Sequence, residues 1–338
     1  VCDFVALGRS QFADPNFINK AKAGHPEQIR KCISCMYCRE RLLGNAMPVE
    51  CSMNPRLGRE YRYRWQDLQK NGAGRPVVVV GGGPGGMECA ILLAKRGFAV
   101  TLLEKSGALG GTLNIAKLPP FKANLQGITD VMALEMAEAG VTVKLNTEAT
   151  PELVSSMNPV GVFLAVGAPP VVPGSIPGIE KAVLAEDVIL GKAPCKGSVA
   201  LIGSGLTGLE CAEMILEQGH PLTMVEMNPA VGQGIYNVVF NDIYSRIQPH
   251  DPVVLTRHKL TAVTDDGVTA EDLSTGETKT IAADTVVLAL GTHNQEAMAE
   301  QFEAAGLTTV LVGSAETPGR IAGATRDGFE KAWVFLAE

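Results

Sequence analysis

The sequence predicts an α/β protein made of two similar strand–turn–helix–strand folds, the second inserted in the first. An internal repeat is the main indication: residues 77–104 (VVVVGGGPGGMECAILLAKRGFAVTLLE) and 199–226 (VALIGSGLTGLECAEMILEQGHPLTMVE) share one pattern. Short apolar strands at 160–167 and 285–291 close the two folds, and the Pro- and Gly-rich stretch 168–179 is typical of a domain crossover. The remaining C-terminal stretch is too small for a domain, so we expect it to rejoin the first fold.

The composition narrows the class of protein. A chain of 338 residues predicts two or three domains, and 46% apolar residues are typical of a well-packed core. A formal charge of −7 without runs of like charge argues against a nucleic-acid partner or an anionic membrane surface. No apolar stretch approaches the roughly 18 residues of a membrane span, so we expect a cytoplasmic protein, with homo-oligomerisation left open. Because Val1 opens directly on an apolar run, we also expect a piece of a longer chain.

Four of the eight cysteines form a group, in which two residues separate Cys32 from Cys35 and Cys35 from Cys38, and twelve residues separate Cys38 from Cys51. An extended strand would point such thiols to alternate faces, so we expect a tight loop that gathers three sulfurs, with Cys51 as the fourth. This is typical of the ligands of a [4Fe–4S] cluster. Structural zinc is the alternative, but it usually takes two separated C-x2-C pairs or matching histidines.

Both glycine-rich turns have the G-x-G-x-x-G spacing of Rossmann-like nucleotide-binding folds. The glycines are Gly81, Gly83 and Gly86 in the first copy and Gly203, Gly205 and Gly208 in the second. In this motif the first glycine makes the turn, the second lets the backbone approach a pyrophosphate, and the third allows close helix–strand packing. Glu104 and Glu226 end the second strands, and we expect each to bind an adenosine ribose. Since the motif occurs twice between strand and helix, purely structural turns with surface acids are the weaker interpretation.

Two such folds predict two dinucleotides, FAD and NAD(P)H. The first copy is followed by LGGTLNIAKLPPF, a second glycine loop whose Gly111 and Thr112 are suited to the extended flavin dinucleotide. The second copy lacks this loop and is the predicted nicotinamide site. No Arg stands beside Glu226 to meet a 2′-phosphate, so NADH is favoured over NADPH.

Together these motifs resemble the NADH:flavin oxidoreductase family that includes 2,4-dienoyl-CoA reductase, clostridial-type enoate reductases and trimethylamine dehydrogenase. The stretches IRKCISCMYC and CSMNPRLGRE are similar to the family's cluster segment, and LGGTLNIAK to its FAD domain. The cysteine spacing is similar to the trimethylamine dehydrogenase branch.

The resemblance also implies FMN in the full-length protein. The opening DFVALGRSQFADP is similar to the last strand and phosphate loop of the family's FMN-binding (β/α)8 barrel, with Gly8 and Arg9 as phosphate contacts. The rest of that barrel, about 250 residues, would precede Val1, so we name no catalytic acid. Gly313 and Ser314 stand where the family usually has a Gly-Asp pair, and the resemblance assigns them to FAD.

In the family, electrons pass from NADH to FAD, through the cluster, to FMN, where an activated C=C of a small-molecule substrate (enoate or enoyl-CoA type) is reduced. The resemblance implies that this chain is the electron-input portion. The alternative is an amine dehydrogenase of the trimethylamine type, which delivers electrons to an electron-transfer flavoprotein. The intact second glycine motif argues for the reductase. A third hypothesis is a nucleotide- and cluster-binding module without turnover.

These assignments predict four segments. They are a remnant of the barrel at 1–30, a cluster segment at 31–74, an FAD-binding domain at 75–189 and 292–338, and an NAD(P)H-binding domain at 190–291.

Overall fold

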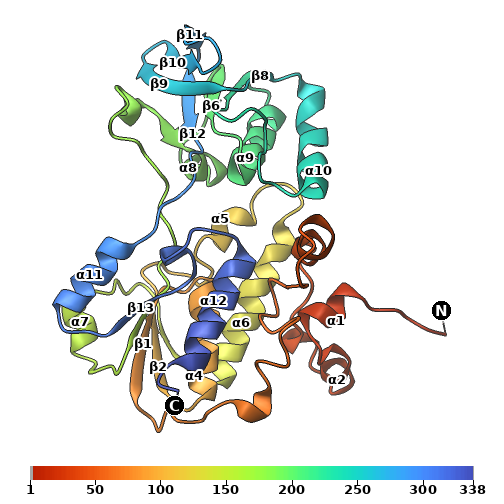
Figure 1. Ribbon diagram of the computed structural model, residues 1–338, viewed down its shortest axis with the longest axis vertical. Helices are drawn as coiled ribbons and strands as arrows, with labels where there is room; N and C mark the ends of the chain where they lie inside the picture. The colour runs from red at the N-terminus through yellow and green to blue at the C-terminus, as the bar shows by residue number, and fades with distance from the viewer. Residues whose placement is uncertain (1–2, 338) are drawn as a thin grey trace. The chain divides into compact units, whose positions relative to one another are not determined.

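The computed structural model describes residues 3–337 and divides into two compact units (Figure 1). Within the described range, unit 1 holds residues 3–114, 124–168 and 293–337, and unit 2 holds residues 115–123 and 169–292. Unit 2 is therefore inserted in unit 1, as the repeat and the closing strands predict.

Unit 1 is built on a parallel five-stranded sheet in the order β13-β4-β1-β2-β3. Its strands are β1 (Pro76–Val80), β2 (Ala99–Leu103), β3 (Thr142–Lys144), β4 (Val162–Leu164) and β13 (Thr309–Leu311). Helices α4 (Pro84–Lys95), α6 (Gln126–Glu138) and α12 (Ile321–Val334) pack together on one face (Figure 1). On the other face, α7 (Pro151–Ser155) and α11 (Glu296–Ala304) pack against apolar side chains of β1, β2 and β4. Burial on both faces explains why β1 reads as an unbroken run of valines.

Unit 2 repeats this sheet in the order β5-β12-β6-β7-β8, again with parallel strands. The strands are β5 (Val183–Leu184), β6 (Val199–Ile202), β7 (Leu222–Val225), β8 (Val253–Leu255) and β12 (Thr285–Leu288). Val199 and Leu201 of β6 face a core shared with α8 (Ala185–Ile189), α9 (Leu206–Glu217) and α10 (Asn237–Ile247). The alternate residues, Ala200 and Ile202, face a second core on the opposite side of the sheet.

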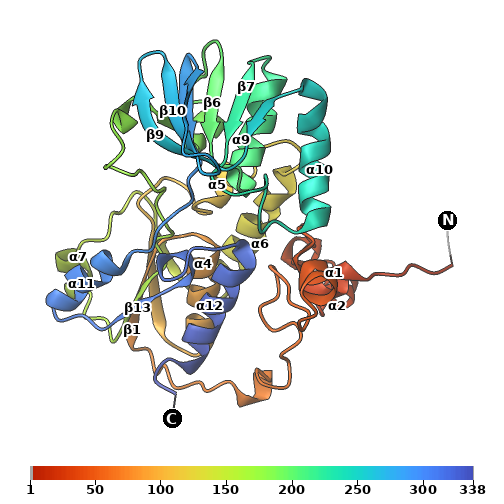
Figure 2. The same cartoon turned by 45° about the horizontal axis from the view of Figure 1, so that its top comes forward.

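That second core is covered by an antiparallel sheet that the sequence analysis did not predict. It contains β9 (His258–Thr264), β10 (Gly267–Asp272) and β11 (Thr278–Ala282), and Figure 2 shows β9 and β10 on the side away from α9 and α10. Its sequence signal is the Asp265-Asp266-Gly267 turn between two β-branched runs, which is typical of a hairpin.

The predicted boundary at residue 189 lies too late in the chain. Residues 169–189 belong to unit 2, because β5 pairs with β12, and Val188 and Ile189 of α8 are buried in its core. Residues 115–123, expected within the FAD-binding domain, also belong to unit 2. Both errors concern segments whose partners are distant in sequence.

The segment before unit 1's sheet contains short helices. They are α1 (Arg9–Ala13), α2 (Phe17–Lys22), η1 (Pro26–Gln28), α3 (Tyr37–Arg39), the π-helix η2 (Glu40–Gly44) and η3 (Trp65–Asp67). The strand predicted at the start is wrong over residues 3–8, which form none, while residues 1 and 2 lie outside the described part. Phe4 and Val5 are 93% and 73% exposed, and no strand among residues 3–337 pairs with them, so their apolar pattern alone cannot hold a strand.

The remaining short elements connect the larger ones. They are α5 (Leu113–Ala116), η4 (Ala123–Leu125), η5 (Ile179–Lys181), η6 (Gln248–His250) and η7 (Gly313–Ala315). None of the helices in residues 3–337 combines the length and the apolar character that a membrane span requires.

Candidate functional site

The first and third glycines of each turn are required by the fold. Gly81 and Gly203 have φ of +104° and +98°, and a Cβ at either would overlap the carbonyl of Ala165 or Ala289 on the neighbouring strand's extension. A Cβ at Gly86 or Gly208 would overlap the carbonyl of the first glycine of the same turn. These positions therefore allow the helix to pack directly on the strand.

The second glycines are different, because they face open space. No atom lies within 4 Å of a Cβ built on Gly83 or Gly205, and each residue is the N-cap of a 12-residue helix, α4 or α9. As glycines, these N-caps have no side chain to occupy the helix N-terminus, and neither helix has an acid in its first turn. The geometry fits a pyrophosphate, which would occupy the open space and accept hydrogen bonds from the first-turn N–H groups.

The predicted ribose acids are buried and already hold their own turns. Glu104 Oε2 accepts a hydrogen bond from Gly82 N–H (2.8 Å), and its Oε1 accepts from the Ser106 N–H (2.8 Å) and hydroxyl (2.7 Å). Glu226 Oε2 accepts from the N–H and hydroxyl of Ser204, and its Oε1 from the N–H and side-chain amide of Asn228. Burial alone would raise the pKa of Glu226, but the hydrogen bonds from Ser204 and Asn228 hold it below its usual value.

Unit 1 brings the residues predicted for FAD close to its glycine turn. Gly110 N–H donates to Gly82 O (2.8 Å), and a Cβ on Gly111 would lie 3.2 Å from Gly83 Cα. Thr112 follows on the same loop and is exposed. Gly313 has φ of +62° and lies against Ala324 of α12, which also contacts Gly85 of α4. Ser314 follows Gly313 in η7, so both predicted loops reach α4 or its glycine turn.

The four predicted cluster cysteines lie on one segment of unit 1. Burial, and after it the neighbouring Cys35, raises the pKa of Cys38, and burial raises the pKa of Cys51 to about 11. Ser34 and Met36, between the first three cysteines, have φ of +56° and +58°, so the backbone bends at both positions.

The chemistry of these residues fits an iron–sulfur cluster, whose ligands would be the four thiolates. Two sulfurs have a backbone N–H nearby, Ser34 N at 3.4 Å from Cys32 Sγ and Met53 N at 3.4 Å from Cys51 Sγ, and such N–H groups stabilise thiolate charge. Across residues 3–337, no three His, Cys, Asp or Glu side chains already stand in a metal-binding arrangement. The cluster ligands therefore remain a prediction.

The predicted FMN contacts lie near this loop. Gly8 and Arg9 are exposed at the start of α1, and Arg9 Nη1 lies 3.3 Å from Met36 Sδ. The Arg9 charge acts to lower the pKa of Cys38, against the larger effect of burial. Their role toward an FMN phosphate stays a prediction.

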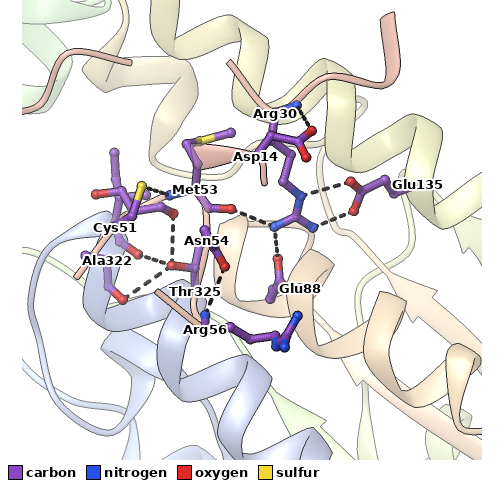
Figure 3. Close-up of polar contacts among 12 residues, drawn as sticks. Asp14, Arg30, Cys51, Met53, Asn54, Arg56, Glu88, Glu135, Ala322 and Thr325 are labelled. Atoms are coloured by element: carbon purple, nitrogen blue, oxygen red, sulfur yellow. Dashed lines mark hydrogen bonds and ion pairs between the residues drawn. The ribbon is translucent and has the colours of Figure 1, made fainter. Parts of the chain in front are cut away.

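Arg30, which the sequence analysis did not single out, connects the cysteine segment to the helices of unit 1. Figure 3 shows its guanidinium between Glu135 of α6 and Glu88 of α4, with the carbonyl of Met53 as a third partner. Two features of the sequence could have indicated this contact. One is an arginine two residues before the first cysteine of the group, and the other is a glutamate at position 88, which the nucleotide-binding motif does not require.

Comparison with known proteins identifies the family. Residues 75–313 match the model of the pyridine nucleotide-disulphide oxidoreductase family. The chain belongs to this family. The match spans both glycine turns and the inserted fold, so the predicted fold class and the predicted kind of enzyme family are confirmed.

Several longer proteins resemble the chain. An NADH oxidase of Thermoanaerobacter brockii is 36% identical over 98% of this chain and 52% of its own length. A cinnamate reductase of Clostridium sporogenes is 33% identical over 86% of this chain and 43% of its own length. A solved 2-naphthoyl-CoA reductase superposes with a TM-score of 0.89 at 27% identity, over 97% of this chain and 50% of that one.

These matches confirm the predicted resemblance to the NADH:flavin oxidoreductase family that includes enoate reductases and trimethylamine dehydrogenase. The chain spans about half the length of the curated relatives it matches.

Proposed function

We propose that this chain is the electron-input portion of an NADH-dependent flavin and iron–sulfur oxidoreductase. When bound, FAD would take a hydride from NADH, a [4Fe–4S] cluster would carry single electrons, and FMN in a barrel outside this chain would reduce an activated C=C of an enoate or enoyl-CoA type substrate. The similar cinnamate reductase supports this substrate class, since cinnamate is an α,β-unsaturated carboxylate, and the similar 2-naphthoyl-CoA reductase is named for an aromatic acyl-CoA.

One observation carries the proposal: two turns of the same geometry each present an open second glycine at a helix N-terminus. Gly83 and Gly205 leave room for two pyrophosphates. A second glycine loop lies beside each turn, since Gly110 N–H donates to Gly82 O (2.8 Å) and Gly232 N–H donates to Ser204 O (3.1 Å), so the prediction that the second copy lacks such a loop is wrong. FAD is assigned to unit 1 and NADH to unit 2 because LGGTLNIAK, which follows the first turn, resembles the FAD domain of the family.

The second fold also supports NADH over NADPH. Glu226 is buried in its turn as an acceptor of four hydrogen bonds, and a 2′-phosphate beside a carboxylate would be repelled. Met227, Asn228 and Pro229 follow it, and none carries a positive charge.

The experiment is an NADH-to-ferricyanide assay on the purified chain loaded with FAD. We expect NADH-dependent reduction of ferricyanide, together with bleaching of the bound flavin's absorbance near 450 nm. Retention of FAD without any NADH-dependent bleaching would contradict the proposal and favour the nucleotide-binding module. Analysis of iron, acid-labile sulfide and zinc on the same sample separates a cluster from structural zinc.

An amine dehydrogenase of the trimethylamine type is the second candidate, favoured by the cysteine spacing of two, two and twelve residues. In that case electrons leave to an electron-transfer flavoprotein, and the second glycine turn need not bind a nicotinamide. Binding of NADH to the chain, measured as quenching of the protein's fluorescence, distinguishes the reductase from the amine dehydrogenase. Only the reductase requires the nicotinamide site at Gly205 and Glu226.

A further inference from the structure

We propose that Arg30 is the positioning residue of the cysteine segment, fixing both of its cysteine-bearing stretches on helices α4 and α6. The inference rests on the proposed function only in that the cysteines are assigned to a cluster. Arg30 contacts none of the four predicted cluster thiols. Its role is to hold in place the backbone that carries these cysteines.

The first stretch is held through the backbone of Arg30. Its N–H donates to Asp14 Oδ2 (3.0 Å), and Lys20 Nζ pairs with the same oxygen (2.7 Å). Asp14 is 4% exposed, so this contact is shielded from water. Because Arg30 lies two residues before Cys32, fixing its backbone and side chain fixes the entry to the loop.

The second stretch is held through the side chain. Arg30 Nη1 donates to the carbonyl oxygen of Met53 (2.8 Å), and the N–H of Met53 lies 3.4 Å from Cys51 Sγ (Figure 3). On the other side of this stretch, the hydroxyl of Thr325 of α12 lies 3.1 Å from the carbonyl oxygen of Ser52, and its single proton is shared with the carbonyl of Ile321 in its own helix at the same distance. The backbone around Cys51 is therefore held on α4 and α6 by Arg30, and it passes next to Thr325 of α12.

The anchor on the helices is a buried charge cluster. Arg30 Nε and Nη2 contact the two oxygens of Glu135 (2.9 and 2.5 Å), while Nη1 contacts Glu88 Oε2 (2.7 Å). The side chains of Arg30, Glu88 and Glu135 are 12%, 6% and 13% exposed. Burial alone would lower the pKa of Arg30, but the two carboxylates raise it. The planar guanidinium of Arg30 donates hydrogen bonds to three groups in different directions, namely Glu135, Glu88 and the carbonyl of Met53. The single ammonium group of a lysine could not reach all three.

A simpler explanation of this charge cluster is that Arg30 only neutralises the two buried carboxylates. The contact with Met53 distinguishes positioning from neutralisation, since a carbonyl needs no counter-charge. Removing the arginine and both negative charges together would restore a neutral interior but would leave the Cys51 stretch without its anchor.

The test compares three variants with the wild-type chain. Arg30→Met removes the anchor, and the triple variant Arg30→Met with Glu88→Gln and Glu135→Gln removes it without leaving unpaired charge. Arg96→Met is the matched control: Arg96 is 0% exposed in the same unit and donates to Gln69, Asn71 and Ala332, all outside residues 30–53.

After anaerobic reconstitution with iron and sulfide, we expect iron per bound FAD to fall by about 10-fold or more in Arg30→Met, as for residues that orient metal ligands. The triple variant should regain most of the lost melting temperature but not the iron, and its residual cluster should give an altered EPR signal. Arg96→Met should lose melting temperature and keep its iron per FAD. Restored iron in the triple variant, or equal iron loss in Arg96→Met, would overturn the proposal.

A second measurement separates this inference from the proposed function. In the iron-free chain, the alkylation rate of Cys51 by iodoacetamide, followed by mass spectrometry, reports its placement directly. We expect faster alkylation in both Arg30 variants than in wild type and Arg96→Met, and equal rates would overturn the positioning role. If wild-type protein binds no iron, the cluster assignment fails, while the alkylation comparison still decides the role of Arg30.

Discussion

Glu226 Oε2 accepts two hydrogen bonds from Ser204, one from the backbone N–H at 2.9 Å and one from the hydroxyl at 2.6 Å. Glu104 makes the corresponding backbone contact with Gly82 at 2.8 Å. In both folds the acid predicted for a ribose therefore braces the glycine turn that would hold the pyrophosphate. Four donors already fill the acceptor positions of Glu226, so a ribose hydroxyl would have to displace the Ser204 hydroxyl or the Asn228 amide.

Glu226→Gln should affect both stability and cofactor use. The substitution replaces charge-assisted hydrogen bonds to a buried group, so we expect a loss of about 1–3 kcal/mol in the free energy of unfolding. The KM for NADH should rise about 10-fold, and the preference for NADH over NADPH should narrow because the carboxylate no longer repels a 2′-phosphate. Chemical denaturation and steady-state kinetics measure these effects. An unchanged preference for NADH over NADPH would show that Glu226 stabilises the glycine turn without contacting the ribose.

The contribution of Glu226 should depend on pH in one direction. Its pKa in the folded chain lies below the ordinary 4.5, so the ionised form stabilises the fold. That stability is fully present above the unfolded pKa and is lost as the pH falls through the lower folded pKa. The difference in melting temperature between wild type and Glu226→Gln should therefore shrink over the range in which the pH falls from about 4.5 through the lower folded pKa. A difference that is constant over this range would contradict the assignment.

Gly205→Ala and Gly203→Ala should separate binding from folding within one turn. Gly205 has φ of −65° and open space around it, so alanine should leave the melting temperature unchanged while obstructing the pyrophosphate and raising the KM for NADH at least about 10-fold. Gly203 has φ of +98° and abuts the Ala289 carbonyl, so alanine should destabilise the fold by about 2 kcal/mol or more. Calorimetry and NADH titrations distinguish the two. Equal effects of both variants on melting temperature would refute the division of roles.

Cys51→Ser should abolish most of the iron and sulfide while FAD remains bound. The reason is that four thiolates are needed around a [4Fe–4S] cluster, whereas the flavin contacts predicted at Gly83 and Gly111 are on other loops. Iron, sulfide and flavin are measured on the same sample. Cys195→Ser is the control, because Cys195 is buried in the core of unit 2 and should leave the iron content unchanged. Equal iron loss in the control would point to general unfolding.

The sequence alone determined the features that depend on local spacing. Positive φ at Gly81 and Gly203, the open second glycines, and the helices that start there are encoded within a few residues, because a sharp turn with no room for a Cβ admits only glycine. The insertion of the second fold was also readable, from a repeat and two closing strands. The antiparallel hairpin of β9 and β10 was readable too, although its Asp-Asp-Gly signal was overlooked.

Only the tertiary structure decided which distant segments share an environment. Residues 169–189 join unit 2 because β5 finds its partner in β12, about a hundred residues later in the chain. Arg30 contacts both Glu88 and Glu135 because α4 and α6 pack side by side. No local sequence pattern predicts that a charged residue at position 30 will be buried between these helices. The burial of Glu226 under its own turn has the same cause: hydrogen-bond geometry is set by packing, which sequence periodicity does not specify.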